Sequence, residues 1–436
     1  MKKIFLLLFS LTFFLLTVDA EAVEQNVTIN RFLTKAYVDN KDEAIPIINA
    51  NVEIHYYDGD GNRIILLDGL VTNNEGELKD VTVRVPEGIN RIYFRYLLEN
   101  SEIGRIVNNK GITYHPITST IIPENKIIDV ESLRFFDNSM VEDAKQYTYQ
   151  AIKVWNLYQT MVMETKSSVQ VALQQFPELQ ANFDYQFKPL PVLYEYNCER
   201  SKAAVLARSS TTFGGIRTGD YYIHIPHLQS LNTMSQTGQT EFFNINLAHE
   251  WAHWAMHLAI GPKMAVGGYQ NHYSYNLNEG MSYKEGWALF QSNRYMYGYD
   301  WNYNLDNSTQ TSKLDSKYGK HEMCFGKSTN WTVNSAFRDI YDIASPKEPE
   351  DQFEIAQAWM PEVINADQEY RQKLSTGLLF IAMVDSNATT FAEYVAYLQD
   401  NDFIKDSEAF DQIMELNGFD TIGRFTLDGN GELIDY

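Results

Sequence analysis

The stretch from residue 244 to residue 260 constrains the fold more than any other part of the chain. Its large apolar residues and its alanines recur at helical spacing, and Gly261-Pro262 follows as a stop signal, so the stretch is predicted to be a buried helix. His249 and His253 are four residues apart and therefore lie on one face of that helix. Their ring nitrogens can reach a single metal ion. Glu250, beside the first histidine, can take a proton from a water bound to that ion.

The arrangement His249-Glu250-x-x-His253 resembles the HExxH signature of zinc metallopeptidases with the zincin fold. The resemblance implies that Zn²⁺ is the cofactor, that both histidines are its ligands and that Glu250 is the general base. The alternative is a pair of histidines on a surface helix that binds no metal. We take the metal site as the working hypothesis because the pattern falls on a predicted helix.

A catalytic zinc usually has three protein ligands, so a third residue is needed. Metzincins supply it from the same segment, as a histidine that follows a glycine. Here Ala259 occupies the position of that histidine and Met256 the position of the glycine, so a metzincin site is excluded. A glutamate from a following helix is the remaining source.

Glu285 is the preferred third ligand, because residues 285–287 read Glu-Gly-Trp and open an apolar helix. This segment resembles the Glu-Gly-Trp motif of fungalysins, which implies a gluzincin-like site in which the glutamate binds zinc. The chain departs from that motif at Leu289, where fungalysins have an aspartate that orients a zinc histidine. Glu279, in a segment similar to that of neutral aminopeptidases, is the alternative ligand. Ser282 and Glu285 also fit a helix-capping pattern that needs no metal.

The first 22 residues have the pattern of a secretory signal peptide. Two lysines precede an apolar run over residues 4–16, and Ala20-Glu21-Ala22 supplies small residues for cleavage. We therefore expect a secreted protein, extracellular or periplasmic. No later run is apolar and long enough for a membrane helix, so no stable membrane insertion is expected.

The chain of 436 residues has a net charge of −22, from 57 acidic and 35 basic residues. An acidic surface is repelled by phosphate groups and anionic lipids, so no nucleic-acid partner is expected. Cys198 and Cys324 are the two cysteines. An oxidising compartment would allow them to pair, but the sequence does not show that they meet. The sequence leaves the oligomeric state open.

The length predicts more than one domain. From residue 23 to residue 135, short strands separated by turn residues predict an antiparallel β-sandwich, with residues 51–67 as its clearest hairpin. Residues 70–78 loosely resemble the transthyretin-like repeats of secreted peptidases. Residues 136–436 are expected to form a mainly α, zincin-like catalytic domain, which makes the fold α+β. A strand at Tyr221–Ile225 is expected at a sheet edge, where it would line the substrate cleft.

These expectations converge on a secreted zinc metallopeptidase that hydrolyses peptide bonds in a protein or peptide substrate. Glu250 would activate the metal-bound water. The alternative is a catalytically silent zincin scaffold used for binding or surface interaction, and the intact His249-Glu250-His253 set argues against it. An aminopeptidase is a third hypothesis, supported only by the segment around Glu279.

The residue that stabilises the transition state is not identified by the pattern. Four residues could donate a hydrogen bond to an oxyanion, and nothing ranks them: His224, His272, Tyr273 and Tyr275. His257, one turn beyond His253, is expected at the rim of the site and not as a ligand. Asp339 and Asp342 are expected on a solvated helix face.

Overall fold

The computed structural model of the protein divides into two compact units. The first contains Met1–Leu97 and His115–Lys145, and the second contains Leu98–Tyr114 and Gln146–Tyr436. The structure describes residues 23–36, 44–132, 144–195, 205–210, 216–226, 236–264, 279–297, 330–341, 353–417, 419, 426–427 and 433–434. The predicted signal peptide and both cysteines lie outside these ranges.

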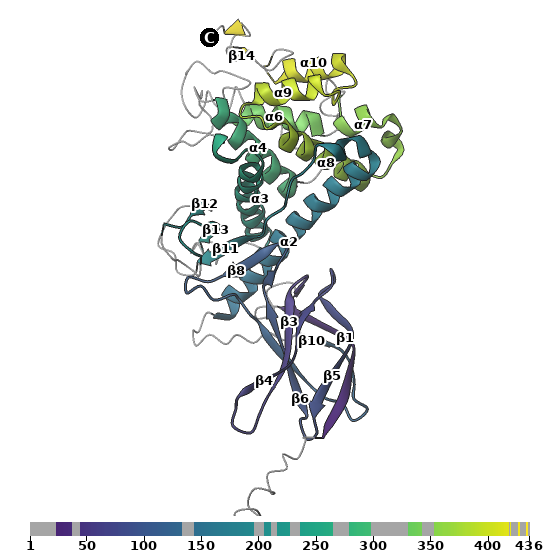
Figure 1. Ribbon diagram of the computed structural model, residues 1–436, viewed down its shortest axis with the longest axis vertical. Coiled ribbons are helices and arrows are strands. Elements are labelled where there is room, and N and C mark those ends of the chain that lie inside the picture. The colour runs from purple at the N-terminus through teal and green to yellow at the C-terminus, as the bar shows by residue number, and fades with distance from the viewer. Residues whose placement is uncertain are drawn as a thin grey trace, which may run out of the picture. The chain divides into compact units, whose positions relative to one another are not determined.

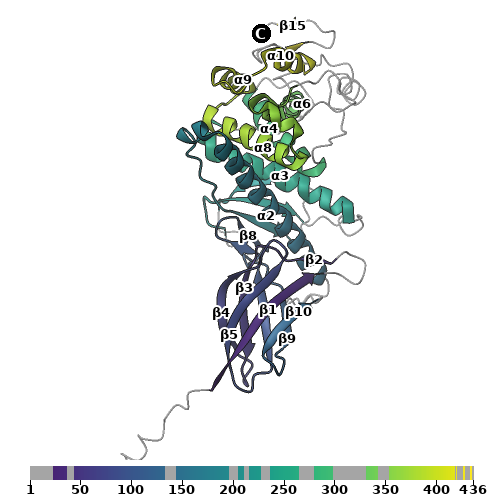
Figure 2. The same ribbon diagram turned by 90° about the vertical axis from the view of Figure 1, so that its right-hand side faces the viewer.

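The first unit is a sandwich of two β-sheets (Figure 2). In one sheet, β1 (Glu24–Ala36) pairs in parallel with β10 (Ile127–Ser132) and antiparallel with β5 (Glu77–Pro86) and β2 (Ile45–Pro46). The other sheet is antiparallel and has the order β4 (Arg63–Val71), β3 (Asn51–Tyr57), β6 (Arg91–Leu97), β9 (Ile117–Ile121). The antiparallel sheets expected here are thus present, apart from the parallel β1–β10 pair.

Alternating side chains hold the two sheets together. Phe32 of β1 and Phe94 of β6 are fully buried and stack with ring centroids 3.8 Å apart. The predicted hairpin is formed by β3 and β4. Its turn is closed by Asp58, whose Oδ1 accepts hydrogen bonds from the backbone N–H of Asp60 at 2.9 Å and of Asn62 at 2.8 Å. Asp58 therefore serves a turn.

The second unit contains a five-stranded sheet in the order β12 (Val205–Arg208), β13 (Tyr221–Pro226), β11 (Leu190–Glu195), β8 (Gly104–Val107), β7 (Glu99–Asn100). The hairpin β7–β8 belongs to this sheet, although the division at residue 135 assigned it to the first domain. The hairpin can pair with β11 because residue 104 is a glycine. Gly104 has φ +139° and lies so close to the carbonyl of Leu190 that a Cβ would not fit.

Two helices, α2 (Ala144–Gln175) and α3 (Gln236–Ile260), cover one face of this sheet (Figure 1). On that face the Tyr194 hydroxyl donates to Gln150 of α2 at 2.5 Å, and the Tyr194 ring contacts Phe243 of α3. The other helices are α4 (Glu279–Tyr297), α6 (Asn330–Tyr341), α7 (Ile355–Trp359), α8 (Gln368–Ser386), α9 (Phe391–Asp400) and α10 (Ser407–Leu416). Short 3₁₀ turns cover Pro177–Ala181, Gly261–Lys263 and Pro361–Asn365, and Thr426–Leu427 pairs with Leu433–Ile434.

The predicted α+β class is confirmed: antiparallel sheets come first and a mostly helical part follows. The expected helix around residues 244–260 is α3, which begins earlier, at Gln236. Among the described residues, no helix combines the length and apolar character needed to cross a membrane.

The expectation for Tyr221–Ile225 was wrong. This segment is β13, an interior strand that pairs in parallel with β11 and antiparallel with β12. The edge strand is β12 (Val205–Arg208), which comes earlier in the chain. The pattern of β13 is that of any buried strand, and its neighbours depend on long-range pairing.

Candidate metal centre

α3 carries His249 and His253 on one face because four residues make just over one helical turn. Packing sets which way this face points. Trp251, on another side of the helix, is 4% exposed and stacks on Phe380 of α8. The two histidine rings meet edge to face, and their Nε2 atoms are 3.2 Å apart.

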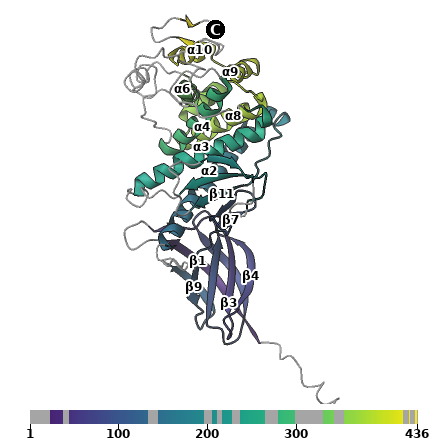
Figure 3. The same ribbon diagram turned by 90° about the vertical axis from the view of Figure 1, so that its left-hand side faces the viewer.

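Glu285 reaches the histidines from α4, which packs between α3 and α6 (Figure 3). Its Oε2 lies 3.3 Å from Nε2 of His249 and 3.3 Å from Nε2 of His253. These three are the one group of His, Cys, Asp and Glu side chains with metal-binding spacing that the described part of the chain contains.

The neighbouring residues explain why α4 can approach so closely. Trp287 is buried against Phe290 and Phe337. Gly286 faces α6, where a Cβ would lie 2.5 Å from Cγ1 of Val333. The glycine therefore lets the two helices touch next to Glu285. The sequence showed the Glu-Gly-Trp motif but gave no sign of this packing role.

The three ligand atoms fit a tetrahedral zinc site. Atoms about 2.0–2.1 Å from a tetrahedral ion are separated from one another by about 3.3–3.4 Å. The observed separations are 3.2, 3.3 and 3.3 Å. Two imidazoles and one carboxylate are also a donor set of catalytic zinc, which leaves one position for water. The residues present therefore fit the ion that the motif implies.

The electrostatics of the cluster also suit a cation. Burial raises the pKa of the Glu285 carboxyl, but His253 and His249 lower it by more, so the net pKa lies far below its usual range. Burial lowers the pKa of His249, but its hydrogen bond to the Glu285 carboxylate and the charge of Glu250 raise that pKa by more. The cluster is therefore an ionised carboxylate that attracts positive charge, from protons or from a metal.

Glu250 is held beside the cluster by the edge strand. Its Oε2 accepts a hydrogen bond from the backbone N–H of Leu206 in β12 at 2.6 Å. The side chain of Glu250 is nearly buried, with 9% of the residue exposed. No sequence pattern indicated Leu206, because its contribution is a main-chain group that every residue except proline carries.

The alternative third ligand, Glu279, is not part of the cluster. It is the first residue of α4, and the described groups that could hold a metal do not include it. The capping explanation for Glu285 also fails, because Ser282 and Glu285 both lie inside α4 and not at its start.

The histidine ring of His253 lacks a typical orienting partner. Its Nδ1 is buried and has no hydrogen-bond partner among the described residues. Zinc-binding histidines commonly donate this proton to a carboxylate or carbonyl.

Other candidate residues lie away from the cluster. His224 pairs with Glu195 at 2.7 Å, on the sheet face opposite to Tyr221 and α3. His257 packs against Tyr221 and Trp254, as expected for a rim residue. Asp339 is 8% exposed and accepts a hydrogen bond from Asn417 at 2.5 Å, so it does not lie on a solvated face. His272, Tyr273, Tyr275 and Asp342 lie outside the described residues.

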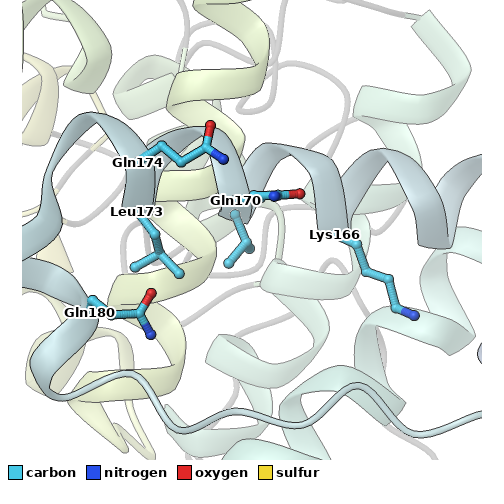
Figure 4. A pocket seen from close by; sticks show the side chains of 6 residues that line it. Lys166, Gln170, Leu173, Gln174 and Gln180 are labelled. Atoms are coloured by element: carbon cyan, nitrogen blue, oxygen red, sulfur yellow. The ribbon is translucent and has the colours of Figure 1, made fainter.

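A separate shallow pocket lies along α2 and the 3₁₀ turn after it (Figure 4). It is lined by Lys166, Val169, Gln170, Leu173, Gln174 and Gln180. None of these residues belongs to α3, α4 or β12, so the pocket is not part of the metal centre.

Comparison with known proteins identifies no relative: no family model, no curated protein and no solved structure matches the chain.

Proposed function

We propose that the protein is a zinc-dependent metallopeptidase with a gluzincin-like site. One observation carries this proposal: His249, His253 and Glu285 place three ligand atoms at tetrahedral spacing, with Glu250 beside them. Two of the ligands and the base come from one helix and the third comes from another. The similarity to HExxH peptidases supports the proposal at the level of the motif.

In the proposed reaction, a bound Zn²⁺ would polarise the scissile carbonyl and lower the pKa of a water toward about 7. His249, His253 and Glu285 hold the ion. Glu250 takes the proton from the attacking water and passes it to the leaving amine. The N–H of Leu206 keeps the Glu250 carboxylate on the strand side of the cluster. The cluster as described consists of two imidazoles and a carboxylate beside Glu250, so the proposed hydrolysis is direct, by water.

The substrate in this proposal is a protein or peptide outside the cytoplasm. The secreted location depends on the signal-peptide pattern of residues 1–22. The acidic net charge of −22 supports neither a nucleic-acid nor an anionic-lipid partner.

The decisive experiment combines zinc content with peptide cleavage. Purified wild-type protein should contain one zinc and cleave a denatured protein substrate. Glu250→Gln should keep the zinc and lose turnover by roughly 10²–10⁴-fold, the usual contribution of a general base. Glu285→Ala should lose the zinc, whereas the matched variant Glu279→Ala on the same helix should retain it.

Two results would contradict the proposal, one for the role of Glu250 and one for the activity itself. Cleavage that survives Glu250→Gln would remove Glu250 from the mechanism. Stoichiometric zinc without cleavage of any substrate would favour the catalytically silent binding scaffold.

A further inference from the structure

The edge strand that binds Glu250 also carries an arginine. Leu206, whose N–H binds Glu250, is followed two residues later by Arg208. Side chains two residues apart in a strand point to the same face and are separated by about 6.5–7 Å. Arg208 pairs with Tyr221 of β13, whose ring contacts α3, so Arg208 lies on the face of the sheet that α3 covers.

Two contacts fix the side chain of Arg208, and neither of them is with a carboxylate. Nε donates to the carbonyl of Gly219 at 2.9 Å, and the guanidinium carbon lies 5.6 Å from the centre of the Tyr221 ring. Tyr221 in turn contacts Trp254 and His257 of α3, one turn beyond His253. Arg208 is exposed, and among the described residues no carboxylate lies within ion-pair distance of it.

Within the described residues, Arg208 shares this lack of a carboxylate partner with Arg84 and Arg91 and differs in it from five other arginines. Carboxylates lie beside Arg31, Arg63, Arg95, Arg294 and Arg371. The chain carries 57 acidic residues against 35 basic ones, so an arginine has many possible carboxylate partners. The positive charge of Arg208 also contributes to lowering the pKa of His257, after burial, so its field reaches α3.

We propose that Arg208 binds a carboxylate of the substrate near the scissile bond and so makes the enzyme selective for peptides that present a carboxylate at that position. This inference rests on the proposed function, because the metal centre defines where a peptide would be cut. The carboxylate has two possible sources: an Asp or Glu side chain, or the free C-terminus of the peptide. A planar guanidinium recognises either through paired N–H···O hydrogen bonds.

The test measures binding and does not depend on turnover. Zinc-loaded Glu250→Gln protein is titrated calorimetrically with two peptide pairs. The two peptides of the first pair have amidated C-termini and differ only at one position near the expected cleavage site, which is Glu in one peptide and Gln in the other. Further pairs place this Glu or Gln at other positions along the peptide. The second pair has a neutral sequence with a free or an amidated C-terminus. We expect one pair to show about a tenfold preference for the carboxylate.

The variants then assign this preference to Arg208. Arg208→Gln should abolish it, and Arg208→Glu should reverse it in favour of a peptide with Lys at the same position. Arg217→Gln, which removes an arginine from the adjoining loop, is the matched control and should keep the preference. A merely structural role for Arg208 would weaken all peptides equally and would not reverse the charge preference.

The outcomes separate this inference from the proposed function. Equal affinity for both members of each pair, or a preference unaffected by Arg208→Gln, would overturn the inference and leave the peptidase assignment intact. An Arg208-dependent preference in a protein that cleaves nothing would support carboxylate binding and overturn the peptidase assignment.

Discussion

Replacing Gly286 by alanine should damage the proposed metal centre without changing any of its three proposed ligands. A Cβ at this position would lie 2.5 Å from Cγ1 and 2.6 Å from Cβ of Val333, and 3.0 Å from the carbonyl oxygen of Asn330. Carbon atoms in contact are normally about 3.5–4.0 Å apart, so α4 and α6 must separate locally by about 1 Å. Glu285 is the adjacent residue and would move with the backbone of α4.

The expected magnitudes follow from these distances. Overpacking of a tight contact costs about 1–3 kcal/mol, and the better helix propensity of alanine returns about 1 kcal/mol, so the free energy of unfolding should fall by up to about 2 kcal/mol. Zinc affinity should fall more clearly. Ligand distances in a metal site tolerate only about 0.2 Å, and disturbing the support of a ligand typically costs about 10–100-fold in affinity.

The assay is a zinc titration against a competing chelator, together with urea unfolding of the metal-free protein. Val333→Gly removes the two nearest of the three atoms that the new Cβ would meet, so the double variant Gly286→Ala/Val333→Gly should bind zinc more tightly than Gly286→Ala alone. Gly59→Ala is the matched control, because nothing lies within 4 Å of a Cβ at that turn position. Wild-type zinc affinity in Gly286→Ala, or no recovery in the double variant, would refute this account of how Glu285 is positioned.

Three further predictions address the base, the metal and the β-sandwich. Leu206→Pro removes the backbone N–H that binds Glu250, and proline is tolerated there because this N–H lies on the outer edge of the sheet. We expect kcat to fall about tenfold or more while the zinc content stays unchanged. An unaltered kcat would mean that this hydrogen bond does not position the base. Chelation should lower the midpoint of thermal unfolding, because zinc at about 1,000 times its Kd stabilises the folded state by about 4 kcal/mol, and Glu285→Ala should show no such shift. Burial, helped by Arg63 and Arg95, lowers the pKa of His55 from 6.5 to about 4, so the unfolded chain binds more protons between these values. The stability contributed by neutral His55 is complete above pH 6.5 and lost as the pH falls toward 4, by up to about 3 kcal/mol. Unfolding followed by circular dichroism from pH 7.5 downward should therefore show a weaker pH dependence for His55→Gln, and an identical dependence would contradict the assignment.

Much of the architecture was predictable from local patterns. The alternation in Asn51–Tyr57 and the turn residues after it predicted the β3–β4 hairpin, and the apolar spacing around Leu247 and Trp251 predicted α3. Such patterns report the backbone conformation and the buried side of one segment. They do not report which segment it meets, so β13 was misplaced at the sheet edge and the hairpin Glu99–Val107 was assigned to the wrong unit.

In the candidate site, too, local patterns predicted some features and long-range packing decided the others. The sequence by itself determined that His249 and His253 share a face, because helix geometry places residues four apart on one side. It also made Glu285 the preferred third ligand, although Glu279 stayed possible. Only the tertiary structure decided that Glu285 lies 3.3 Å from both imidazoles, that Leu206 holds Glu250 and that Arg208 of the same strand has no carboxylate partner among the described residues. These contacts join segments far apart in the chain. Long-range packing of α3 against α4 and β12 creates them, and no local periodicity encodes that packing.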